Sequence, residues 1–144
     1  MITKLQPIRQ VIEKYDINAK KSLGQNFIFD LNLTSKIARL AGDLTSFEIL
    51  EIGPGPGGLT RGLLSEGAHR IVAIEKDKRC ISALREIQNH YPERLQIIEG
   101  DANEIHQEKY FTKPVKVIAN LPYNIGTKLL IEWLTAKDWP PFWH

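Results

Sequence analysis

The sequence predicts an α/β fold built on a mostly parallel sheet. From residue 47 onward, short apolar runs alternate with stretches of helical periodicity, which is typical of parallel strands joined by crossover helices. A cluster of glycines and prolines follows the first apolar run, where such folds turn from a strand into a helix. The 144 residues, with a net charge of +2 and 42% hydrophobic side chains, fit one globular domain and exclude fibrous and disordered classes.

Residues 1–46 are predicted to form an amino-terminal arm that precedes this region. Apolar residues recur there with the period of a helix behind Pro7, and proline suits the first helical position. The residues of this face are Ile8, Val11, Ile12 and Tyr15. Residues 1–40 carry a net charge of +4, whereas residues 41–144 carry −2. This basic arm indicates a polyanionic partner such as nucleic acid only weakly, because a solvated helix face explains it equally well.

A second helix is expected in the arm between Asp30 and Gly42. Aspartate suits the N-cap of a helix, and glycine suits the position after the C-cap. The apolar side of this helix is predicted to consist of Leu33, Ile37, Leu40 and Ala41.

The α/β domain itself is predicted to be residues 47–144. Its expected strands are 47–52, 70–74, 95–98 and 115–119, and its expected helices are 58–66, 77–90 with Asp77 as N-cap, and 127–136. Four strands leave the last one with an open edge. We therefore expect an incomplete domain, cut after the fourth strand and its helix, whose edge can pair with another copy.

Cysteine and histidine content argues against several kinds of chemistry. Cys80 is the only cysteine, which excludes an intramolecular disulfide, and its place on a predicted helix face favours a core role. The four histidines are scattered without ligand spacing, so no metal site is expected. No apolar run is long enough to span a membrane and no signal-peptide pattern is present, which predicts a cytoplasmic protein.

The strongest local signal is the sequence Glu-Ile-Gly-Pro-Gly-Pro-Gly-Gly at residues 51–58. Glycines allow a tight turn and a close approach of the backbone to a ligand, and the helix that follows presents unpaired N–H groups. Gly53 and Gly55 are therefore candidate contacts to a cofactor that contains a nucleoside. The loop is no Walker motif, but Gly53, Gly55 and Gly58 have the spacing of a dinucleotide-binding fingerprint, so NAD stays open at this point.

Two acidic residues follow the next two predicted strands at the same edge of the sheet. Glu75 lies 22 residues after Gly53, where a carboxylate accepts hydrogen bonds from ribose hydroxyls. This position fits NAD and S-adenosylmethionine equally, and a surface ion pair with Lys76 or Lys78 is the alternative. Asp101 follows the third strand in a Gly-Asp turn, where a carboxylate can accept a hydrogen bond from an adenine amino group.

The residues Asn120, Leu121, Pro122 and Tyr123, at the end of the fourth strand, separate these possibilities. A dehydrogenase has no need of them, whereas an enzyme that methylates an exocyclic amino group does. Acceptors directed at the amino hydrogens favour the pyramidal, nucleophilic nitrogen, and the Asn120 side-chain oxygen and the Leu121 carbonyl are the expected acceptors. Pro122 stiffens the turn, and Tyr123 offers a face on which an extruded base can stack. A plain Asn-x-Pro turn is the alternative interpretation.

Together these motifs resemble the ribosomal RNA adenine dimethyltransferase family, and within it the enzymes of the bacterial small subunit. The motifs that carry the resemblance occur in family order, at residues 20–27, 51–55, Glu75, Asp101 and 120–124. The resemblance implies a Rossmann-like, S-adenosylmethionine-dependent methyltransferase fold. It also implies the transfer of two methyl groups to N6 of each of two adjacent adenosines near the 3′ end of 16S rRNA. The cofactor contacts that it implies are Asn26, Ile28, Gly53, Glu75, Asp101 and Asn120.

Members of that family continue into further strands and a carboxyl-terminal helical domain that this sequence does not contain. We therefore expect the chain to keep much of the cofactor pocket but to methylate rRNA weakly or not at all. Other methyltransferases are alternatives, namely those that methylate large-subunit rRNA, adenine in DNA or glutamine. Outside methyl transfer, the alternatives are an NAD-dependent oxidoreductase and a non-catalytic module that binds RNA or a ribosomal particle.

Overall fold

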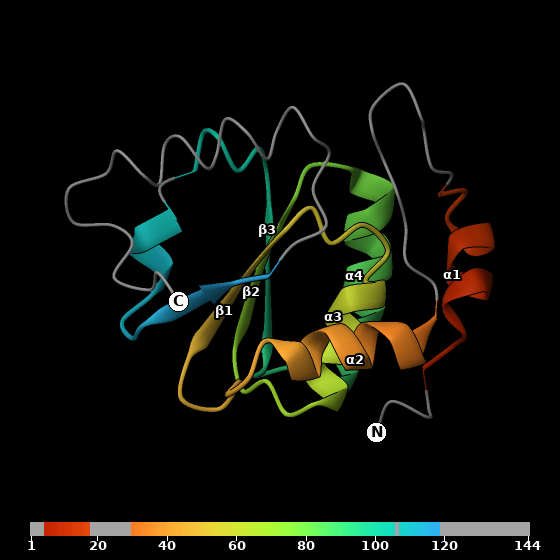
Figure 1. Ribbon diagram of the computed structural model, residues 1–144. Helices are drawn as coiled ribbons and strands as arrows, with labels where there is room; N and C mark the ends of the chain where they lie inside the picture. Colours follow the sequence, from red (N-terminus) through yellow and green to blue (C-terminus); the bar gives the residue numbers. More distant parts are fainter. Residues whose placement is uncertain (1–4, 18–29, 106, 119–144) are drawn as a thin grey trace.

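The chain folds around a four-stranded sheet in the order β3-β2-β1-β4 (Figure 1). The computed structural model describes residues 5–17, 30–105 and 107–118. Within these ranges the strands are β1 (Glu48–Ile52), β2 (Ile71–Glu75), β3 (Leu95–Glu99) and β4 (Val115–Val117). Every neighbouring pair is parallel, which confirms the predicted α/β class.

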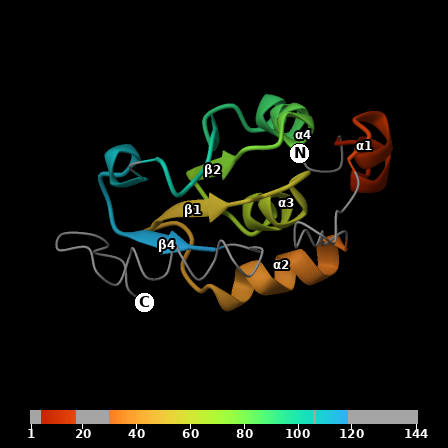
Figure 2. The ribbon, with the colours of Figure 1, turned by 90° about the horizontal axis from the view of Figure 1, so that it is seen from above.

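The α-helices lie on one side of this sheet. They are α1 (Ile8–Lys14), α2 (Leu31–Leu40), α3 (Gly58–Ser65) and α4 (Lys78–His90). A short 3-10 helix, η3 (Gln107–Tyr110), follows β3 on the other side (Figures 1 and 2). The sequence patterns do not predict η3, and they miss several element ends by one or two residues. The helix predicted at 127–136 lies outside the described residues, and the division of the chain after residue 46 stays a prediction.

Three predicted cap residues are confirmed and a fourth is displaced. The side chains of Asp30 and Asp77 accept hydrogen bonds from the N–H groups two residues on, each at 2.9 Å. Gly42 follows the C-cap of α2 with φ 79°. Pro7 is the N-cap of α1 and not its first helical residue, because α1 begins at Ile8.

The predicted apolar face of α2 is partly wrong. Leu33 and Leu40 are 47% and 81% exposed, whereas Thr34 and Ala38 are buried. The cause is the close approach of α2 to α3: a Cβ atom at Gly62 would lie 2.6 Å from the backbone carbonyl carbon of Thr34. Small side chains therefore form this interface, and the two leucines turn outward.

The two central strands, β1 and β2, are buried along their whole length. Alternate side chains pack on the helices or on the opposite side of the sheet, where Leu50 and Ile74 belong to a second cluster. The register pairs Glu51 with Ala73, a member of the cluster under the helices. Since paired residues of parallel strands face the same side, Glu51 lies on the helical side, and so does Glu75, two residues beyond Ala73.

The described helices include none that is both long enough and apolar enough to span a membrane.

Candidate cofactor site

The glycine loop joins β1 to α3 across the carboxyl end of the sheet. Gly53, Gly55 and Gly57 have φ values of 64°, 60° and 99°, a region that side chains disfavour. The Gly53 N–H donates to the Ile74 carbonyl at 2.9 Å and so extends the β1–β2 ladder. Gly57 is the N-cap of α3, and among the described residues no side chain caps this helix. The first-turn N–H groups of α3 therefore keep their capacity to bind a ligand.

Glu75 ties the glycine loop to the start of α4. Its Oε1 accepts a hydrogen bond from the Gly55 N–H at 3.0 Å, and its Oε2 accepts from the N–H groups of Lys76 and Asp77, both at 2.8 Å. Glu75 is 8% exposed, so the alternative of a surface ion pair with Lys76 or Lys78 is wrong. A carboxylate has about four lone-pair sites, so these bonds leave capacity for one further donor.

Glu51 is a second carboxyl group beneath the loop, and the sequence patterns did not single it out as a site residue. It is 1% exposed, and the Thr60 hydroxyl of α3 donates to its Oε1 at 2.5 Å. Burial raises the pKa of Glu51 to about 8; the Thr60 hydrogen bond opposes this rise, and the negative charge of Glu75 adds to it. The available signal was an acidic residue inside an apolar strand, two positions before the first loop glycine.

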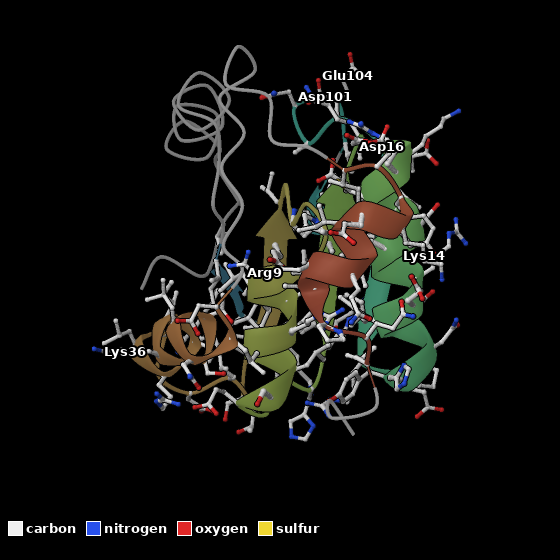
Figure 3. The ribbon with its side chains drawn as sticks, turned by 90° about the vertical axis from the view of Figure 1, so that its right-hand side faces the viewer. Arg9, Lys14, Asp16, Lys36, Asp101 and Glu104 are labelled. Carbon is white, nitrogen blue, oxygen red and sulfur yellow. The ribbon has the colours of Figure 1, made fainter. Side chains whose placement is uncertain are left out.

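Asp101 lies in the turn after β3, which meets the end of β2 through a hydrogen bond from the Gly100 N–H to the Glu75 carbonyl at 2.9 Å. Its Oδ1 accepts from the Asn103 N–H at 2.9 Å and from the Asn103 side-chain amide at 3.2 Å. Figure 3 shows Asp101 and Glu104 at the end of the molecule toward which the β1 arrow points. The turn therefore presents its carboxylate at the same edge as the glycine loop.

The structure thus brings four of the predicted contacts, Gly53, Gly55, Glu75 and Asp101, to one edge of three adjacent strands. Their roles stay predictions. The other predicted site residues, Asn26, Ile28, Asn120, Leu121, Pro122 and Tyr123, lie outside the described residues. The described residues end at Ile118, just after β4, where its N–H donates to the Leu50 carbonyl at 3.0 Å.

Cys80 lies on α4 and is buried, as its predicted core role requires. Burial is the largest cause that raises the pKa of its thiol far above the ordinary value, so the thiol stays protonated at neutral pH. Across the described part of the chain, no three metal-ligating side chains form a group that could hold a metal ion.

Comparison with known proteins gives one family. A family model described as ribosomal RNA adenine dimethylase matches residues 16–140. A relative from Ruegeria sp. (strain TM1040), named ribosomal RNA small subunit methyltransferase A, is 63% identical over 99% of this chain and 51% of its own length. A relative of the same name from Paracoccus denitrificans (strain Pd 1222) is 61% identical over the same shares. The chain therefore spans about half the length of the curated relatives that it matches.

Solved structures of two related transferases have the same fold. The 23S rRNA methyltransferase ErmE superposes with a TM-score of 0.64 at 28% identity, over 77% of this chain and 43% of its own. A dimethyladenosine transferase from Plasmodium falciparum superposes with a TM-score of 0.61 at 29% identity, over 76% of this chain and 38% of its own. These likenesses confirm the predicted Rossmann-like methyltransferase fold.

Proposed function

The chain belongs to the ribosomal RNA adenine dimethylase family, and we propose that it is the S-adenosylmethionine-binding part of an enzyme that dimethylates adenosines of 16S rRNA. The acceptors are N6 of two adjacent adenosines near the 3′ end of that RNA. The names of the relatives support the small subunit as the partner. The setting that we propose is ribosome assembly in the cytoplasm.

The observation that carries this proposal is the carboxylate of Glu75, held in place between the glycine loop and α4. Three backbone N–H groups fix it before any ligand arrives, so binding need not order it. The remaining lone-pair capacity suits a ribose hydroxyl, and the Oδ2 atom of Asp101 is the oxygen that we assign to the adenine amino group. With two carboxyl groups beneath it, the loop also suits a ligand that carries a positive charge.

When bound, S-adenosylmethionine supplies an electrophilic methyl group on positively charged sulfur, which an amino nitrogen can take by direct displacement. The chain contributes position and polarity. Asn120 and Leu121 accept from the hydrogens of the target amino group, Pro122 stiffens that turn, and Tyr123 stacks on the extruded adenine. The contacts of Asn26 and Ile28 with the cofactor belong to the same proposal.

Calorimetric titration of the chain tests the cofactor assignment. We expect S-adenosylmethionine to bind with a dissociation constant of about 1–100 μM and NAD not to bind. Glu75→Ala should weaken binding by about 10- to 100-fold, because hydrogen bonds to a charged group contribute about 1.5–3 kcal/mol. Glu99→Ala is the matched control, since Glu99 pairs with Glu75 in register but is exposed. Binding of NAD, or equal affinity in the Glu75 variant, would contradict the assignment.

Tritium transfer tests the reaction. We expect this chain to methylate 30S subunits that lack the modification more slowly than the Ruegeria relative, which is about twice as long. The part of the relative that this chain does not match adds surface with which the longer protein can hold RNA. Equal rates would show that the additional length is dispensable.

A non-catalytic role in binding RNA is the second candidate, and the net charge of +4 on residues 1–40 is compatible with it. The variant Asn120→Ala distinguishes the catalytic role from the RNA-binding role. If Asn120 is catalytic, methyl transfer is lost while RNA affinity is kept; loss of both would indicate that the motif is structural. The large-subunit alternative has weaker support, because the 63% identical relative carries a small-subunit name.

A further inference from the structure

Two buried carboxyl groups lie next to one another beneath the glycine loop. Glu51 and Glu75 come from adjacent strands and face the same side of the sheet. Both are at least nine-tenths buried. Two carboxylates in such a setting repel one another, so a single negative charge is favoured over two.

Their hydrogen bonds decide which of the two carries the charge. Glu75 accepts from three backbone N–H groups, which stabilise its ionised form. The described partner of Glu51 is one hydroxyl, that of Thr60. The proton of the pair therefore resides on Glu51, which agrees with the direction in which burial moves its pKa.

Among the described residues, three other ionisable groups on this side of the sheet are neutral or directed elsewhere. Cys80 of α4 is a buried thiol that stays protonated. Arg61, next to Thr60 on α3, donates to the Gln6 carbonyl at 2.7 Å. Lys116 of β4 donates to the carbonyls of Ala41 and Asp43 at 2.8 and 2.9 Å, near α2. Glu75 is the neighbour whose charge acts on Glu51.

We propose that Glu51 is a proton-linked specificity residue: it holds a proton in the free chain and releases it when a cation occupies the glycine loop. This inference rests on the proposed function, because the cation is the sulfonium of S-adenosylmethionine. A positive charge near the pair offsets the second negative charge, so ligand binding and loss of the proton favour one another. The demethylated product has a neutral sulfur and lacks the offset that the sulfonium provides. The residue thus favours donor over product, and it does so more strongly as pH rises.

The test is calorimetry of donor and product, S-adenosylmethionine and S-adenosylhomocysteine, between pH 6.5 and 8.5. Buffers of different ionisation enthalpy report how many protons are released on binding. Glu51→Gln is the reference, because it keeps an acceptor for the Thr60 hydroxyl but cannot titrate. The amino group of each ligand also titrates, but it affects wild type and variant equally. Dividing the wild-type affinity by the variant affinity therefore removes its contribution to the pH dependence.

For the donor, we expect this affinity ratio to rise about tenfold across the range, and wild type to release more protons than Glu51→Gln. For the product, we expect the ratio to change less than about threefold. Thr60→Val should move the rise to higher pH, because it removes the hydrogen bond that favours the ionised form of Glu51.

Equal proton release by wild type and Glu51→Gln would overturn the inference, and so would an equal rise for donor and product. Either result leaves the proposed function intact as long as the donor binds. If neither ligand binds wild type at any pH, the proposed function fails as well, so the two failures are distinguishable.

Discussion

At the residue scale, Glu51 makes the stability of the chain depend on pH even without a ligand. The folded chain keeps this proton up to about pH 8, whereas the unfolded chain loses it near pH 4.5. Unfolding therefore releases a proton between these values, and the free energy of unfolding falls as pH rises through the window, by up to about 1.4 kcal/mol per pH unit. We expect Glu51→Gln to gain stability relative to wild type from pH 5 to pH 8 in urea titrations. Glu99→Gln is the exposed control, and parallel curves for wild type and Glu51→Gln would contradict the burial of this proton.

Also at the residue scale, two glycines with nearly the same φ separate backbone strain from steric contact. Gly57 and Gly67 have φ of 99° and 100°, but a Cβ at Gly57 would overlap Ile87, whereas one at Gly67 meets no atom within 4 Å. We expect Gly67→Ala to cost about 1 kcal/mol of stability and Gly57→Ala about 2–4 kcal/mol, because overpacking adds to the strain. Chemical denaturation of both variants gives the comparison. Equal losses would mean that α4 yields to the added methyl group.

At the element scale, the contact between α2 and α3 depends on a glycine in a helix. Replacing glycine by alanine at an exposed position of a helix normally stabilises a protein. At position 62, however, the methyl group of alanine would lie 2.7 Å from the Thr34 carbonyl oxygen. We therefore expect Gly62→Ala to lower the unfolding free energy by about 1–3 kcal/mol. Ser65→Ala, at an exposed position of the same helix, should change it by less than about 0.5 kcal/mol. A stabilised Gly62→Ala would show that the two helices can separate at little cost.

At the scale of the whole molecule, a ligand that binds the folded chain alone stabilises the entire sheet. The candidate site joins the ends of three strands and the starts of α3 and α4, so unfolding destroys it. At a concentration 100 times its dissociation constant, S-adenosylmethionine should raise the unfolding free energy by about 2.7 kcal/mol. Thermal unfolding with the donor, with NAD and without ligand measures this. An unchanged Tm with the donor would mean that this half-length chain does not hold the pocket.

Features that depend on local pattern were predictable from the sequence. Short apolar runs, separated by stretches of helical periodicity, indicated β1 to β4. The short polar side chains of Asp30 and Asp77 indicated where α2 and α4 begin. The glycine loop and the acidic residue at the end of β2 indicated the edge of the sheet on which the candidate site lies. Each of these signals acts over a few residues, through backbone conformation, capping or the period of side-chain burial.

Other features depended on contacts between segments far apart in the chain. The outward turn of Leu33 and Leu40 follows from how closely Gly62 lets α3 approach Thr34, and α2 alone carries no sign of it. The protonation state of Glu51 depends on Thr60 and Glu75, which the fold brings close to it from α3 and β2. By itself, the sequence determined the order of the described strands and α-helices, and the family. Tertiary structure alone decided which helix face is buried and which carboxyl group keeps its proton, because burial and charge interaction are properties of the packed chain.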